Sequence, residues 1–179
     1  SRQILHREKT NKIIIINLFH AHMMTAMLDT NIIDELLLEK EFCNMLNSLS
    51  TKGELRLFIT GVLKNQICQI PDINRKDELT QVLENLKIEY IPVEFAPYGY
   101  AYGECYGGLS PDVTLDHKKF IGGNYKEIED AMIAATASSD KYRFDYIVTN
   151  DKNFRKRLNS QKMITKAITF IEFKKKLGN

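Results

Sequence analysis

Cysteine is scarce in this sequence: it occurs only as Cys43, Cys68 and Cys105, and no two cysteines form a Cys-x-x-Cys motif. A small, odd number of cysteines predicts no disulfide framework and favours a reduced, cytoplasmic setting. The four histidines lack the spacing of zinc ligands, and no serine or cysteine lies in a recognisable nucleophile motif. These absences count against a zinc site and against catalysis through a covalent enzyme intermediate.

Long hydrophobic runs and an excess of one charge are also missing. The most apolar stretch, residues 13–19, is interrupted by Asn17 and is too short to span a bilayer. We therefore expect no membrane partner. Lys plus Arg number 25 against 23 Asp plus Glu, for a net charge of +2, so binding of a nucleic acid would require a local basic patch.

With 179 residues, 44% of them hydrophobic, the chain is long enough for one domain with a substantial core. Basic residues and the short apolar run precede the regular pattern of strands and helices, which begins only around Thr25. We expect residues 1–23 to be an N-terminal extension, with an added strand as the alternative, and residues 24–179 to form the domain.

Strands and helices are predicted to alternate along this domain. Strands are expected at 25–28, 55–60, 88–95, 146–150 and 168–173, and helices at 31–49, 61–69, 74–86, 126–139 and 151–158. Pro92 places the third strand at or near an edge. The alternation predicts an α/β fold with a parallel sheet covered on both faces, whose strands end at one common edge.

Residues 96–124 are rich in glycine and tyrosine and are predicted to form a loop. Its tyrosines could stack on single-stranded bases. An insertion stabilised by tyrosine packing, or a surface that binds a partner, is an equally good interpretation.

Three aspartates follow or begin the predicted elements. Asp29 follows the first strand, Asp130 lies near the start of an alanine-rich helix, and Asp151 follows the strand predicted at 146–150. Carboxylates that converge from separate elements suit Mg²⁺ or Mn²⁺, which prefer oxygen ligands. Each aspartate also has a purely structural alternative, because aspartate is favoured at helix N-caps and in first turns.

The segments around these aspartates resemble the first, third and fourth acidic motifs of PIN-domain nucleases, in the family's order. They are Leu28–Asn31, Asp130–Ala137 and Val148–Phe154. The resemblance implies a three-layer α/β/α sandwich with a mainly parallel sheet. It also implies a hydrolase, a Mg²⁺- or Mn²⁺-dependent endoribonuclease in which Asp29, Asp130 and Asp151 hold the metal. Many such nucleases are VapC-like toxins, so an antitoxin protein, a second copy of the chain and the RNA substrate are the candidate partners.

Other polar residues near the motifs are candidates for supporting roles. Asn31, Thr149 and Asn150 could orient the aspartates or a water molecule. Lys152 and Arg155, on the helix predicted after Asp151, are candidates for contact with RNA phosphates. The alternative for these cations is an ordinary solvated helix surface.

The sequence departs from the family at the second acidic motif. A glutamate is expected there on the helix after the second strand, and the matching position holds Gln66. A neutral amide removes one negative charge from the metal site, so a catalytically weakened module that binds RNA or a protein without cleavage is the alternative function. Spacing does not select among Glu127, Glu129 and Asp112 as a replacement carboxylate.

Overall fold

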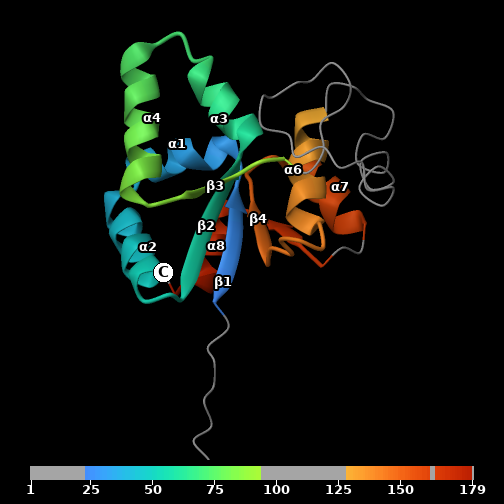
Figure 1. The fold of residues 1–179 in the computed structure, drawn as a ribbon. Coiled ribbons are helices and arrows are strands. Elements are labelled where there is room, and N and C mark those ends of the chain that lie inside the picture. The colour runs from blue at the N-terminus through green and yellow to red at the C-terminus, as the bar shows by residue number, and fades with distance from the viewer. Residues whose placement is uncertain (1–22, 94–127, 162–163, 179) are drawn as a thin grey trace, which may run out of the picture.

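The computed structural model describes residues 23–93, 128–161 and 164–178. Its centre is a five-stranded sheet in the order β3-β2-β1-β4-β5, and every pairing is parallel. The central strand β1 lies between β2 and β4 (Figure 1), so the carboxyl ends of these three strands meet at one edge. The strands are β1 (Met24–Leu28), β2 (Leu55–Thr60), β3 (Glu89–Ile91), β4 (Tyr146–Val148) and β5 (Lys166–Ile168).

Helices cover both faces of this sheet. They are α1 (Thr30–Leu38), α2 (Lys40–Thr51), α3 (Gly61–Cys68), α4 (Ile73–Asn85), α6 (Ile128–Ser138), α7 (Lys152–Ser160) and α8 (Phe170–Lys176). Alternation along β1 sends Ala26 and Leu28 into a core with α1, α2, α4 and α8, whereas Met27 packs with α6 and α7. The predicted three-layer α/β/α sandwich with a parallel sheet is confirmed (Figure 1).

Helix α6 packs closely on the sheet because its buried face is built from small residues. Ala131, Ala134 and Ala137 are buried, as is Met132 between them. The prediction of an alanine-rich helix is confirmed over 128–138, while 126–127 lie outside the described residues. Close packing brings the first turn of α6, which carries Glu129 and Asp130, toward the sheet.

The single helix predicted over 31–49 is wrong, because the chain breaks at Glu39 into α1 and α2. Glu39 has a non-helical backbone, with φ −115° and ψ 66°. Its amide and the Cys43 thiol both donate to the carbonyl of Leu36, at 3.2 Å each, so the freed carbonyl is satisfied. The break leaves Leu38 81% exposed and turns Phe42 into the core.

The strand predicted over 168–173 is also wrong. Strand β5 ends at Ile168, and Phe170 opens helix α8. Thr169 and Glu172 form a reciprocal capping box, in which the Thr169 side chain accepts from the Glu172 amide and the Glu172 carboxylate accepts from the Thr169 amide. This local pattern starts a helix where the apolar residues alone suggested a strand.

The remaining elements agree with prediction apart from their ends. Strand β3 lies at the sheet edge as Pro92 predicted, and β4 stops at Val148 rather than at 150. The proposed extension, up to residue 22, and the tyrosine-rich segment 96–124 lie outside the described residues. Among the helices of the described part, none is long and apolar enough to cross a membrane.

Candidate functional site

Asp29 lies at the carboxyl end of β1, where its backbone amide donates to the carbonyl of Val148 at 3.0 Å. One carboxylate oxygen, Oδ1, caps α1 by accepting from the Thr30 amide at 2.8 Å. The other, Oδ2, accepts from the Thr149 hydroxyl at 2.6 Å and from the Asn31 amide at 2.7 Å. Both oxygens are therefore fixed in direction by named donors.

Burial raises the pKa of Asp29 above its ordinary value, because removing water disfavours the charged carboxylate. Hydrogen bonds from Thr149, Thr30 and Asn31 act in the opposite direction, and the negative charge of Asp151 raises the pKa further. The influence of Asp151 shows that these two carboxylates lie close enough to repel each other. A divalent cation placed between them would relieve that repulsion.

The prediction that Asp151 directly follows a strand is wrong. Strand β4 ends at Val148, and Thr149 and Asn150 lie between it and Asp151. Its position is set by α7, which it caps: Oδ1 accepts from the Phe154 amide at 2.8 Å. The Asp151 side chain is exposed. Within the described residues no donor contacts its second oxygen, Oδ2, which remains available to a ligand.

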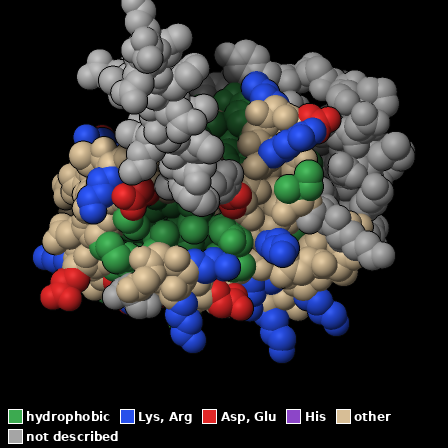
Figure 2. All heavy atoms as spheres, turned by 90° about the horizontal axis from the view of Figure 1, so that it is seen from below, with side chains coloured by type: hydrophobic (Ala, Val, Ile, Leu, Met, Phe, Trp, Pro, Cys, Tyr) green, Lys and Arg blue, Asp and Glu red, His purple; other side chains and the backbone are tan. Residues whose placement is uncertain are grey.

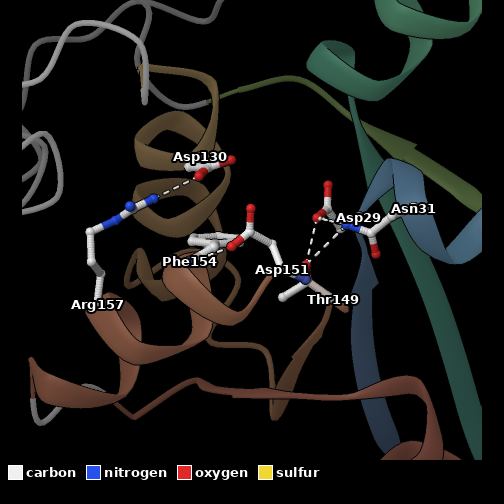
Figure 3. Close-up of polar contacts among 7 residues, drawn as sticks. All are labelled: Asp29, Asn31, Asp130, Thr149, Asp151, Phe154 and Arg157. Carbon is white, nitrogen blue, oxygen red and sulfur yellow. Dashed lines mark hydrogen bonds and ion pairs between the residues drawn. The ribbon is translucent and has the colours of Figure 1, made fainter.

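Asp130 projects from the first turn of α6 toward the same space as Asp29 and Asp151 (Figure 3). Its Oδ2 forms an ion pair with Nη2 of Arg157 on α7, at 2.7 Å. The two side chains are 31% and 25% exposed, so the pair is only partly shielded from water. A cation that binds at Asp130 would have to share this carboxylate with Arg157 or displace the Arg157 guanidinium from it.

Three predicted supporting residues form one network behind the aspartates. The buried Thr149 hydroxyl, besides donating to Asp29, accepts from the Asp151 amide at 3.1 Å. Asn31 bonds the Asp29 carboxylate through its amide nitrogen and accepts from the Asn150 backbone amide through its oxygen, at 2.9 Å. Asn150 in turn accepts from the Phe170 amide at 3.2 Å, which joins the network to α8.

Gln66, at the position where the resemblance predicts an acidic residue, lies between two other elements. Its side-chain oxygen accepts from the Thr30 hydroxyl at the start of α1. Its amide nitrogen donates to Oε2 of Glu129 on α6 at 2.6 Å. The contacts of Gln66 with Thr30 and with Glu129 were not predicted; the only signal for Glu129 was that it directly precedes Asp130. Glu127 and Asp112 lie outside the described residues.

The two cations predicted to contact RNA differ in their surroundings. Lys152 is exposed at the start of α7. Arg155 donates to the carbonyl of Thr149 at 2.8 Å and lines a cavity of about 590 Å³ that also includes Glu35 and Lys174. Seen from the opposite, amino-terminal end of the strands (Figure 2), Lys and Arg side chains are scattered among acidic and apolar ones.

The donor set fits a hard divalent cation in chemistry, since it consists of carboxylate, hydroxyl and amide oxygens. A further polar atom lies on the neighbouring strand: the Thr60 hydroxyl at the end of β2 is buried and has no hydrogen-bond partner among the described residues. The three aspartates are too far apart to enclose a cation, because nowhere in the described ranges are three His, Cys, Asp or Glu side chains grouped closely enough to hold a metal ion. In this conformation a cation would be enclosed incompletely.

No family model matches the sequence, and no curated protein is significantly similar to it. Among solved structures, the chain is similar to one in the crystal structure of VapBC2 from Rickettsia felis bound to a DNA fragment from its promoter. The match covers 82% of this chain and 98% of the other, with 16% identity and a TM-score of 0.51. The two chains share a fold. At this identity the likeness concerns the fold alone and places no site residue.

Proposed function

We propose that this protein is a Mg²⁺- or Mn²⁺-dependent endoribonuclease, a hydrolase of RNA phosphodiester bonds. The observation that supports the proposal is that Asp29, Asp130 and Asp151 project toward one space at the carboxyl edge of the sheet (Figure 3). They come from three separate parts of the chain, and Asp29 is buried although its charged form is disfavoured there. A buried carboxylate with a raised pKa that lies near a second carboxylate is typical of functional sites, and a divalent cation would offset the repulsion between the two.

In the proposed mechanism, Asp29, Asp130 and Asp151 would hold the cation, which would polarise the scissile phosphate and lower the pKa of the attacking water. Thr149 and Asn31 keep the Asp29 carboxylate pointed at the site through their hydrogen bonds of 2.6 and 2.7 Å. Fixed ligands need no rearrangement when charge develops on the phosphate, and this preorganisation favours the reaction.

Basic residues of α7 are proposed to bind the RNA backbone. Lys152 is exposed beside Asp151, and Arg157 already lies next to Asp130. When a cation neutralises Asp130, Arg157 would be released to contact a phosphate oxygen. We include Arg155 only as a secondary candidate, because its guanidinium is bonded to the Thr149 carbonyl.

The biological role that we propose is that of a cytoplasmic toxin neutralised by an antitoxin protein. Its support is the fold shared with a chain of VapBC2 from Rickettsia felis, whose crystal structure holds it bound to a DNA fragment from its promoter. A homodimer is part of the same proposal. A small reading frame with a DNA-binding pattern next to the gene would support the pairing.

The test of the proposed activity is cleavage of a mixed RNA pool by the purified full chain, with Mn²⁺ and with excess chelator. We expect fragments with Mn²⁺, none with chelator, and none from the Asp151→Asn variant. An intact RNA pool in the presence of Mn²⁺ would reject the nuclease assignment.

The second candidate function is a module that binds RNA or a protein partner without cutting. Two features favour it: position 66, where the resemblance predicts an acidic residue, holds Gln66, and Arg157 forms an ion pair with Oδ2 of Asp130. Retention of RNA by the chain in a filter-binding assay, with no cleavage at any Mn²⁺ concentration, would favour this candidate over the nuclease.

A further inference from the structure

The cavity of about 590 Å³ that Arg155 lines lies beyond the carboxyl end of β4, between α1, α7 and α8. Asn150 forms part of its wall and directly precedes Asp151 in the chain. The backbone amide of Asn150 bonds Asn31, which in turn holds the Asp29 carboxylate. The cavity therefore begins beside the candidate site, at the edge of the sheet where ligands of open α/β folds bind.

Two cations from different helices come together at this cavity. Arg155 of α7 and the exposed Lys175 of α8 both line it. The pKa of Glu172 is lowered, mainly by hydrogen bonds from Thr169 and further by the positive charges of Arg155 and Lys175. Both cations thus lie near one carboxylate. The bond from Nη1 of Arg155 to the Thr149 carbonyl fixes the guanidinium, and its other N–H groups can donate to a ligand.

The acidic side chains around the cavity already have partners. Glu39 forms an ion pair with Lys174 at 2.6 Å. Glu35 accepts from the Asn150 side-chain amide at 3.0 Å. Glu172 accepts from the Thr169 amide and hydroxyl and lines a different cavity. The wall that Arg155 and Lys175 share therefore suits an anionic group.

An apolar side chain adjoins these cations. Ile171 lines the same cavity and is 65% exposed. A nucleotide matches this combination, because its phosphate can accept from the cations while its sugar and base cover the apolar surface. The volume lies within the range of about 300–1,000 Å³ that small-molecule sites span. An acidic peptide would use the cations and leave Ile171 exposed.

We propose that this cavity binds one nucleotide of the RNA strand beside the site of cleavage, with Arg155 and Lys175 at its phosphate and Ile171 against its sugar or base. The inference rests on the proposed action on RNA and adds a place where the strand is held without the metal. RNA should consequently bind at this cavity when a chelator is present.

The test measures the fluorescence anisotropy of a labelled single-stranded RNA of mixed sequence with the full chain, in chelator and at increasing KCl concentration. Lys175→Gln should weaken binding several-fold. It should also reduce the slope of log affinity against log salt by about 0.7, the share of one phosphate contact on a single strand. The matched control is Lys176→Gln, which removes the same charge from the next residue, an exposed lysine over the Tyr146 ring. It should keep the wild-type affinity and slope.

Ile171→Ala separates the apolar contact from the charge. It should weaken RNA binding a few-fold and leave the salt slope unchanged, because it removes apolar surface and no cation. Ile73→Ala, at another exposed isoleucine, on α4, is its control and should bind RNA like the wild type.

Each result decides between defined alternatives. If Lys175→Gln binds RNA with the wild-type affinity and slope, or Lys176→Gln loses as much, the inference is wrong, and cleavage with Mn²⁺ still decides the proposed function separately. If Lys175→Gln loses binding of an oligoglutamate peptide while its RNA binding is unchanged, the cavity takes an acidic protein segment and the inference is overturned. If the wild type neither binds nor cleaves RNA, the proposed function fails, and the inference with it.

Discussion

The Thr149 hydroxyl donates to Oδ2 of Asp29 over 2.6 Å, between residues 120 positions apart in the chain. The hydroxyl oxygen of Thr149 also accepts from the Asp151 amide at 3.1 Å. One buried hydroxyl therefore fixes the position of one proposed ligand and the backbone of another. The geometry of the site consequently depends on a residue that need not touch the metal or the RNA.

Replacing Thr149 with valine keeps its volume and removes this hydroxyl. Asp29 and the Asp151 amide would each lose a partner in a buried place, which should lower the free energy of unfolding by about 1–3 kcal/mol. Urea denaturation measures the loss. Thr80→Val on α4, where the hydroxyl bonds only its own helix, is the control and should cost less. Equal losses in both variants would show that the hydrogen bonds of Thr149 stabilise the fold no more than the local hydrogen bond of Thr80 does.

Asp29 should make the stability of the metal-free chain depend on pH. Its pKa is raised in the fold above the ordinary value of 3.8, so at pH values above 3.8 the folded state binds more protons than the unfolded state. The contribution of Asp29 to the free energy of unfolding therefore falls as the pH rises from the ordinary pKa to the raised pKa. Above the raised pKa this contribution is constant. Comparing urea denaturation of the wild type and Asp29→Asn across this window, with chelator present, isolates the effect.

Asparagine at position 29 adds a cost that does not vary with pH, because its amide nitrogen would face the amide of Asn31. Only the change with pH is therefore diagnostic. A difference between the two proteins that is flat, or that grows in favour of the wild type as pH rises, would contradict the raised pKa. Saturating Mn²⁺ should remove the dependence, because the cation favours the ionised carboxylate.

Arg157 should compete with the metal for Asp130. Arg157→Gln removes the positive charge that lies 2.7 Å from Oδ2, so Mn²⁺ should bind more tightly by a few-fold, about 1 kcal/mol. Metal-free stability should drop slightly at the same time, because the ion pair is lost. Arg143→Gln, which breaks the exposed pair with Asp140, is the control. Calorimetric titration that finds Arg157→Gln unchanged or weaker in Mn²⁺ affinity would disprove the competition.

Gln66→Glu alone should destabilise the metal-free chain. It would replace the amide donor by a second carboxylate within hydrogen-bonding distance of Glu129. Like charges so close cannot both ionise readily, so the thermal midpoint should fall at neutral pH and recover with acid or with Mn²⁺. A midpoint equal to that of the wild type in chelator would mean that the two side chains separate freely.

The layers of the fold could be predicted from the sequence because their signals are local. Alternating apolar residues gave strand 55–60, and the alanine-rich run gave the helix that begins near Asp130. The break at Glu39 could not be predicted in this way, since no glycine or proline marks it, and the donors that satisfy the Leu36 carbonyl are the Glu39 amide and the Cys43 thiol. The capping box at Thr169 was a local signal, but the apolar residues around it outweighed it in the prediction.

The sequence predicted the positions of single site residues on their strands and helices, but not the contacts between them. Asp29 follows β1 as predicted, and Asp151 caps α7 although its strand ends earlier. The pairing of Asp130 with Arg157 and the contact of Gln66 with Glu129 depend on how α6 lies against α7 and α3. Such distances between helices are set by packing in three dimensions, and no pattern along the chain contains them.

The most direct test of the proposed shared metal site is the rate of RNA cleavage in saturating Mn²⁺ by three variants, Asp29→Asn, Asp130→Asn and Asp151→Asn. Asp77→Asn, exposed on α4, is the control. Circular dichroism should show all four folded. We predict that each of the three loses cleavage to the level of protein-free RNA, while the control cleaves like the wild type. Wild-type cleavage by any one of the three folded variants would contradict a site built from all three aspartates.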